Sequence, residues 1–189
     1  MNFRSSALLV ALLAWTAPAA EMAQTLVFGG SKTTVSFKYA DKSKFDIDSI
    51  GEDVGAGHIA SKSILKALWP HDSDSFRRDT ANGKTYFYSY QSGDSSTQRF
   101  TVAYTGGCME LWYFLFSPQG KQLDRFTLSE TCASDAEDHS AGKFTKPNTY
   151  LKVSTWINEY PEKGTPANGK LKTRYEIQPN GKVLVKVVK

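Results

Sequence analysis

The sequence predicts a mainly β fold, a β-rich α+β domain in which an antiparallel meander forms a sandwich or partial barrel with one short helix and one disulfide. Three observations support this fold class. Short segments of strand-forming residues follow one another from residue 84 onward, glycine-rich turns separate them, and one segment alone has helical periodicity.

The N-terminus has the three parts of a cleavable secretory signal. Arg4 gives a positive start, an apolar segment covers Ala7–Trp15, and small residues follow up to Ala20. The apolar segment is shorter than the roughly 20 residues that span a bilayer, so we expect no membrane anchor. We predict a signal over residues 1–20, cut possibly as late as residue 23, and a single β-rich domain over 21–189 in the periplasm or the medium.

Two cysteines, Cys108 and Cys132, remain in the predicted mature chain. An even pair in an oxidising compartment is expected to close as a disulfide. No cysteine precedes Cys108, which excludes lipid attachment at a new N-terminal cysteine. We expect the disulfide to tie a central strand to the root of a presented loop over roughly Glu130–Gly142.

The first half of the mature chain has one predicted strand and one predicted helix. Thr33–Tyr39 alternates apolar and polar residues with the period of two of a half-buried strand. His58–Trp69 places Ile64, Leu65 and Leu68 on one side, which predicts a short amphipathic helix that Pro70 ends.

From residue 84 the pattern predicts successive antiparallel strands. Turn residues separate the four segments that we expect to pair as neighbours, namely Lys84–Gln91, Gln98–Tyr104, Cys108–Phe116 and Lys121–Ser129. Near the end of the chain Asn180 and Gly181 form a strong hairpin signal. They predict a hairpin of Lys170–Gln178 and Lys182–Lys189.

Charge is distributed unevenly along the chain. The whole sequence carries +4, whereas residues 143–189 contain ten basic and three acidic side chains, a local charge of +7. Lysines of this kind commonly protect strand edges and keep a protein soluble, which is the interpretation we favour. Attraction of an acidic partner is the alternative.

The densest polar cluster contains Asp135, Glu137, Asp138 and His139. Such side chains can ligate a metal or supply acid–base catalysis, so Asp135, Glu137 and His139 are candidate catalytic residues. The spacing matches neither an EF-hand nor an HExxH motif, and a solvated acidic loop is favoured. The pairs Asp46 with Asp48 and Asp72 with Asp74 are weaker candidates for glycoside hydrolysis.

Motifs for other chemistry are missing from the sequence. No GxSxG nucleophile elbow accompanies His58, His71 or His139, and no Lys-Ser or Lys-Thr follows the glycines Gly55 and Gly57. We therefore expect no cofactor and no metal, and the exported location argues against nucleic acid.

Aromatic residues gather on the predicted strands. Tyr86, Tyr88 and Tyr90 alternate along one strand, so an exposed row of rings is one interpretation, and Tyr86, Tyr88, Tyr90 and Asp138 are candidate binding residues. Rings that fill both sides of a packed sheet are the favoured alternative.

These patterns predict an exported, soluble, non-enzymatic binding protein. Its expected partner is another exported or periplasmic protein, which it would inhibit or neutralise as an inhibitor or immunity protein does. The alternative is a hydrolase or binding module that acts on cell-wall or surface polysaccharide. A carrier of a small ligand or a metal is a third hypothesis.

Overall fold

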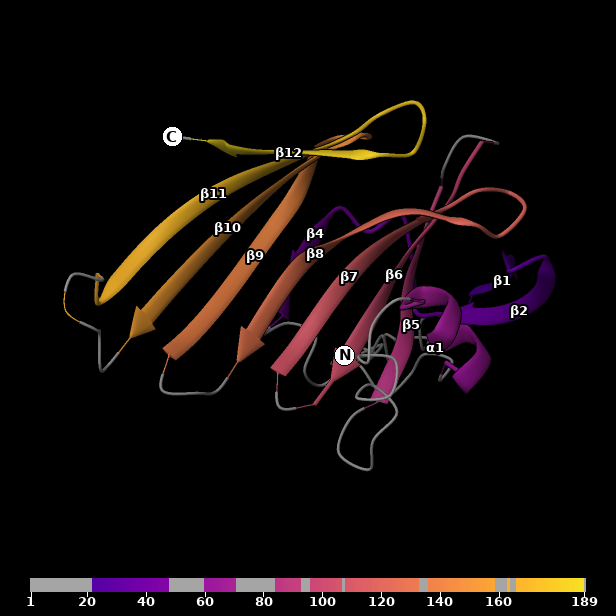
Figure 1. Ribbon diagram of the computed structural model, residues 1–189, viewed down its shortest axis with the longest axis horizontal. Helices are drawn as coiled ribbons and strands as arrows, with labels where there is room; N and C mark the ends of the chain where they lie inside the picture. Colours follow the sequence, from indigo (N-terminus) through magenta and orange to yellow (C-terminus); the bar gives the residue numbers. More distant parts are fainter. Residues whose placement is uncertain are drawn as a thin grey trace, which may run out of the picture.

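The computed structural model describes residues 22–47, 60–70, 84–92, 96–106, 108–132, 136–158, 163 and 166–188. Within them the chain forms one ten-stranded sheet, a separate two-stranded sheet and one short helix (Figure 1). A disulfide joins Cys108 to Cys132. The predicted mainly β fold is therefore confirmed, whereas the predicted signal over 1–20 lies outside the described residues.

The elements follow the chain in this order: β1 Met22–Phe28, β2 Ser31–Phe37, β3 Tyr39–Ala40, β4 Lys44–Asp46, α1 Lys62–Leu68, β5 Lys84–Gln91, β6 Gln98–Thr105, β7 Cys108–Phe116, β8 Gln122–Cys132, β9 Ala136–Lys146, β10 Thr149–Asn158, β11 Asn168–Ile177 and β12 Val183–Val188. In the large sheet β5 to β12 lie in sequence order and pair antiparallel, which confirms the predicted meander. β3 joins β5 in parallel at one side of the sheet. β12 lies at the other side (Figure 1).

The sheet curls because one N-terminal segment touches it at two distant places. β3 pairs with β5 through Tyr39 and Ser89, and β4 pairs with β9 through Phe45 and Gly142. Residues 39–46 therefore bridge two strands that stand four places apart in the sheet order. On the same edge of β9, just before the residues that pair with β4, β9 pairs with β8 only through Asp138–Ser140, which lie opposite Glu130–Cys132. Of the predicted alternatives, this bridged and curled sheet corresponds to the partial barrel.

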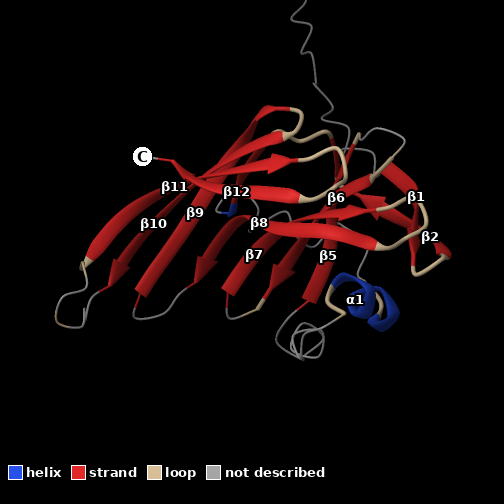
Figure 2. Ribbon diagram, turned by 45° about the horizontal axis from the view of Figure 1, so that its top comes forward, coloured by secondary structure: helices blue, strands red, loops and turns tan. Residues whose placement is uncertain are grey.

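One face of β5–β7 is covered by the β1–β2 hairpin and α1, which both lie at the β5 side of the sheet (Figures 1 and 2). Phe28 and Phe37 from the hairpin and Leu68 from the helix are buried there against sheet residues that include Phe100 and Phe114. These side chains form the first core. The hairpin and helix thus bury an apolar face that water would otherwise reach.

The second core fills the inside of the curl. It contains buried side chains from the bridging segment (residues 39–46) and the residue after it, and from six further strands of the sheet: Phe45, Ile47, Tyr88, Ala103, Leu111, Tyr113, Leu115, Phe126, Leu128, Tyr150 and Ile177. Tyr150 is fully buried, and its hydroxyl donates to the carbonyl oxygen of Leu128 at 2.9 Å. This bond satisfies a polar group that would be costly to bury without a partner.

Several sequence predictions need correction. The expected strand Thr33–Tyr39 is divided, because β2 ends at Phe37 and Tyr39 belongs to β3. The helix is confirmed over a shorter range, Lys62–Leu68, and His58 lies outside the described residues. The predicted presented loop over Glu130–Gly142 is wrong. β8 continues to Cys132 and β9 begins at Ala136, so the disulfide joins two directly opposed strand residues.

Candidate functional site

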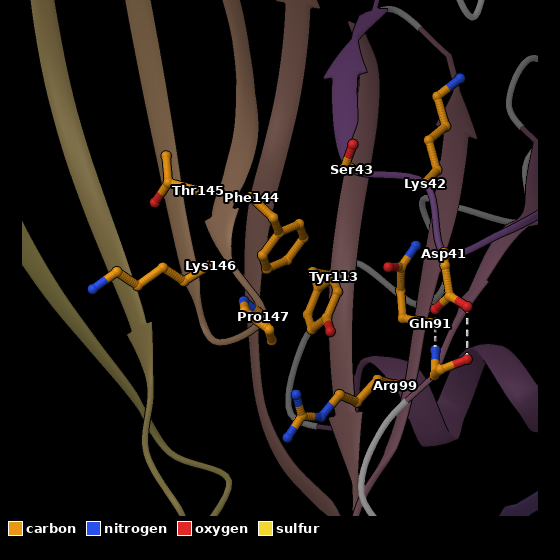
Figure 3. Close-up of a pocket in the computed structure, with 11 residues that line it drawn as sticks. Asp41, Lys42, Ser43, Gln91, Arg99, Tyr113, Phe144, Thr145, Lys146 and Pro147 are labelled. Atoms are coloured by element: carbon orange, nitrogen blue, oxygen red, sulfur yellow. Dashed lines mark hydrogen bonds between the residues drawn. The ribbon is translucent and has the colours of Figure 1, made fainter.

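An open cavity of about 420 Å³ lies at the mouth of the partial barrel. Its walls come from the bridging segment with Asp41 and Lys42, from the ends of β5 and β6 with Gln91 and Arg99, and from the β9–β10 turn with Lys146 (Figure 3). Clefts at the mouths of β-barrels are common places for small-molecule sites. We call this space the mouth cavity.

Arg99 connects two sides of the mouth cavity. Arg99 is only 6% exposed. Its Nε donates a hydrogen bond to Thr97 Oγ1 at 2.8 Å, and its Nη1 donates one to Asn148 Oδ1 at 2.7 Å. Asn148 belongs to the β9–β10 turn, so the guanidinium ties that turn to β6. A planar guanidinium held by two such bonds keeps a fixed orientation.

The bridging segment presents charged groups of both signs. Asp41 accepts hydrogen bonds from the backbone nitrogen of Ser92 at 2.5 Å and from its hydroxyl at 2.7 Å (Figure 3). Lys42 Nζ donates to the Tyr88 hydroxyl at 2.8 Å and lies 4.3 Å from the centroid of the Tyr39 ring. These contacts hold the bridging segment, residues 39–46, against β5 and Ser92 and so position one wall of the cavity.

Behind the cavity wall, buried polar groups form a chain. Gln91 Nε2 donates to Ser89 Oγ at 2.9 Å, and Ser89 Oγ lies 2.7 Å from Thr101 Oγ1. All three residues are buried. Buried polar groups that bond one another hold strands in a specific arrangement, so this network stabilises the β5–β6 part of the mouth.

Tyr113 lies in the wall of the mouth cavity and gives the protein a predictable response to alkali. Burial raises its pKa, and burial likewise raises the pKa of Tyr150 and Tyr175. In the unfolded chain a phenol ionises near pH 10. Above that pH the unfolded state therefore loses protons that the folded state keeps, and stability falls as pH rises.

We expect the free energy of unfolding to decline by about 1.4 kcal/mol per pH unit above pH 10 for each of the fully buried phenols, Tyr113 and Tyr150. Urea unfolding between pH 8.5 and 11.5 measures the decline. Tyrosinate absorbance near 295 nm should rise for these residues only as the protein unfolds. A stability that stays constant up to pH 11.5 would contradict the burial of these hydroxyls.

A second concave site, a groove of about 260 Å³, runs beside the disulfide. Glu130, Cys132, Asp138 and Trp156 lie along it. The Trp156 ring covers Gly169, where an added Cβ would lie 2.0 Å from the indole carbon Cζ2. The absence of a side chain at Gly169 therefore allows the Trp156 ring to approach β11 closely. We call this site the disulfide groove.

The predicted catalytic candidates are only partly described. Asp135 lies outside the described residues, as do Asp48, Asp72, Asp74, His58 and His71; Glu137 occupies a position in β9, but its side chain is not described either. His139 Nε2 lies 3.8 Å from Asp46 Oδ1, a contact between β9 and β4. Across the described residues, no three His, Cys, Asp or Glu side chains are grouped closely enough to hold a metal ion.

The candidate binding residues are dispersed. Tyr88 is only 2% exposed, and Tyr86 packs against the same second core. Tyr90 packs against the first core on the opposite face of the sheet. The three rings therefore fill both sides of the sheet, and the exposed-row interpretation is wrong for them. Asp138 is exposed and lies opposite Trp156 and Cys132 in the disulfide groove.

The C-terminal strands carry a surface that the sequence analysis did not single out. All the large apolar side chains that are exposed in the described part of the chain lie on β10, β11 and β12: Ile157, Leu171, Leu184, Val185 and Val187. By the pairing register, Leu171, Val185 and Val187 share the face of Tyr150 and Tyr175. An apolar surface open to solvent thus continues the second core to the last strand. The signal in the sequence was VLVKVV, an apolar run without alternation at the chain's end.

No protein-family model, curated protein or solved structure matches this chain. Its helix is too short to cross a membrane, and the rest of the described chain adds no other candidate span of that kind.

Proposed function

We propose that this chain is an exported, non-enzymatic binding protein that captures another exported protein by pairing with β12. One observation supports the proposal most strongly. β12 is a six-residue strand at the end of the sheet order, and its side chains are exposed on both faces. An apolar strand with an open edge is a ready template for an extended segment of another chain.

Three of the five large apolar side chains that are exposed in the described part of the chain lie on β12. Leu184 is 44%, Val185 55% and Val187 67% exposed. β11 pairs with one edge of β12 along residues 183–188. At the other edge the Val183 nitrogen donates to Asp124 Oδ2 at 2.9 Å, and no strand of the described residues pairs with Leu184–Val188 there. A partner strand would complete that hydrogen-bond ladder and bury the valines, the two contributions on which strand addition depends.

The charge around β12 indicates the chemistry of the partner. Lys182 and Lys186 flank the valines, and Lys170, Lys172 and Arg174 lie on the neighbouring β11. Glu176 is the one acidic residue of these two strands, and it lies 3.0 Å from Lys186 Nζ. An extended segment that alternates apolar and acidic residues would match both the valines and the lysines.

A second copy of this chain fits less well. Two β12 strands paired antiparallel would bring Lys182 and Lys186 of both copies onto one ribbon, where like charges oppose each other. The predicted signal sequence and the disulfide favour a partner met outside the cytoplasm. Inhibition or neutralisation of an exported protein is therefore the role that we propose.

The test is affinity capture with the mature, disulfide-closed protein from a periplasmic or extracellular extract. We expect a specific protein to be recovered by the wild type and its affinity to fall about tenfold or more with Val185→Lys/Val187→Lys. The matched control is Ile157→Lys, because Ile157 is 53% exposed but lies on the opposite face of the sheet. The control variant should retain the partner. Recovery of no specific protein, or equal recovery by the β12 variant, would refute the proposal.

A second candidate function, binding of cell-wall or surface polysaccharide, is favoured by the disulfide groove. Trp156 lies there beside Asp138 and Glu130, and an aromatic ring next to carboxylates is suited to sugar rings. Glu130 also receives a hydrogen bond from Lys152 Nζ at 2.8 Å. The same capture experiment separates the two functions. A polysaccharide would stay bound to the β12 variant and be lost with Trp156→Ala.

A further inference from the structure

We infer that the mouth cavity binds a small organic anion, a molecule with a carboxylate or phosphate group on a compact apolar body. The site lies among residues of the bridging segment, β5–β7, the end of β9 and the β9–β10 turn, and none of its described lining residues belongs to β12. The inference is independent of the proposed function, so each can fail without the other.

Charge determines the class of ligand. The described lining includes three basic side chains, Lys42, Arg99 and Lys146, and one carboxylate, Asp41. Both carboxylate oxygens of Asp41 already accept hydrogen bonds from Ser92, which draws this group toward the end of β5. The lining therefore carries a positive excess, and a partly enclosed positive site attracts an anion more strongly than an open surface does.

The donors at this site are prearranged. Arg99 is held by Thr97 and Asn148, and a guanidinium presents its N–H groups in a plane that matches a carboxylate or phosphate. Tyr113 is in the cavity wall, and its phenol, like any tyrosine at neutral pH, keeps the proton that it can donate. Binding to such a preformed site costs little conformational entropy.

Apolar groups supply the rest of the recognition surface. The Phe144 ring lies with its centroid 5.3 Å from that of Tyr113, and Pro147 closes the wall on the same side (Figure 3). A ring or short hydrocarbon body can rest against these groups while its acidic end faces the Arg99 guanidinium. The side chains of Lys42 and Lys146 extend away from the middle of the cavity and add positive charge at its rim (Figure 3). The volume of about 420 Å³ is within the range of small-ligand sites.

The experiment titrates the mature, disulfide-closed protein with benzoate, phenyl phosphate, inorganic phosphate and the neutral analogue benzamide, followed by amide chemical shifts. We expect saturable shifts around the mouth cavity with benzoate or phenyl phosphate, and affinity at least about tenfold lower for benzamide. The tighter of the two aromatic anions identifies carboxylate or phosphate as the natural group. Inorganic phosphate alone should bind more weakly, because it lacks an apolar body.

Lys146→Glu is the decisive variant, because this lysine is exposed and its replacement leaves the core intact. Reversing one charge at the rim of the cavity should weaken aromatic-anion binding by about three- to fivefold. Lys170→Glu, an equally exposed lysine on β11 outside the cavity, should change affinity by less than about twofold. Failure of both aromatic anions to bind, equal affinity for benzamide, shifts confined to other parts of the protein, or unchanged affinity in Lys146→Glu would each overturn the inference.

Discussion

Phe100→Ala is expected to lower the free energy of unfolding by about 3–5 kcal/mol. Phe100 is completely buried in the first core. Five other rings lie with centroids within 6.4 Å of its own, namely Phe28, Phe37, Phe87, Phe114 and Phe116. Because these rings come from the hairpin and from the sheet, removal of the Phe100 ring takes packing contacts from both layers at once. Urea unfolding followed by tryptophan fluorescence measures the loss.

The matched control for this variant is Val187→Ala, which removes apolar atoms from a side chain that is 67% exposed. Its free energy of unfolding should stay within about 0.5 kcal/mol of the wild-type value. If Phe100→Ala also changes stability by less than about 1 kcal/mol, the β1–β2 hairpin and α1 do not pack on β5–β7 in the way described.

Removing the disulfide with Cys108→Ala/Cys132→Ala is expected to cost about 3 kcal/mol of stability. The bridge closes a loop across a sequence separation of 24 residues and thereby limits the freedom of the unfolded chain. In the folded state it joins the ends of β7 and β8 next to the disulfide groove. The variant should therefore unfold at a lower urea concentration with its fold unchanged.

Reductant provides the control for this prediction. Added to the wild type, it should reproduce the loss of stability, because both cysteines are only partly buried. Added to the double alanine variant, it should have no effect. A wild-type protein that is equally stable with and without reductant would show that the bridge contributes nothing to stability.

Local signals in the sequence were sufficient for a large part of the fold. The aromatic alternation of Lys84–Gln91 predicted β5 with its observed bounds, and the apolar run Cys108–Phe116 predicted β7. Asn180 and Gly181 correctly predicted the last hairpin, since Gly181 adopts a φ of 77° that glycine tolerates. In each case neighbouring residues alone determine the local conformation.

Strands whose stability comes from their partners could not be predicted from local sequence patterns. β9 has the sequence AEDHSAGKFTK, which is polar at its start and has no clear period of two. It becomes a strand because β10 pairs along its whole length, while β8 and β4 share its other edge. Pairing between distant segments of this kind overrides local propensity. The predicted loop failed for this reason.

The mouth cavity could not be predicted from local patterns either. Asp41, Arg99, Tyr113 and Lys146 are far apart in the sequence and meet only because residues 39–46 bridge β5 and β9. The one available signal was the polar residues Gln91 and Arg99 at the ends of strongly apolar strands. A buried charge or amide in such a position commonly indicates a network or a site.

Hydrogen exchange of the protein in complex with its captured partner tests the central claim, that β12 is the binding strand, most directly. Amides in an open strand edge exchange with solvent, whereas amides in a completed ladder are protected. The account predicts that binding slows exchange within Val183–Val188, at the edge that β11 leaves open, and leaves the mouth of the barrel unchanged. Exchange of Val183–Val188 that is the same in the free and bound protein, with protection elsewhere, would contradict it.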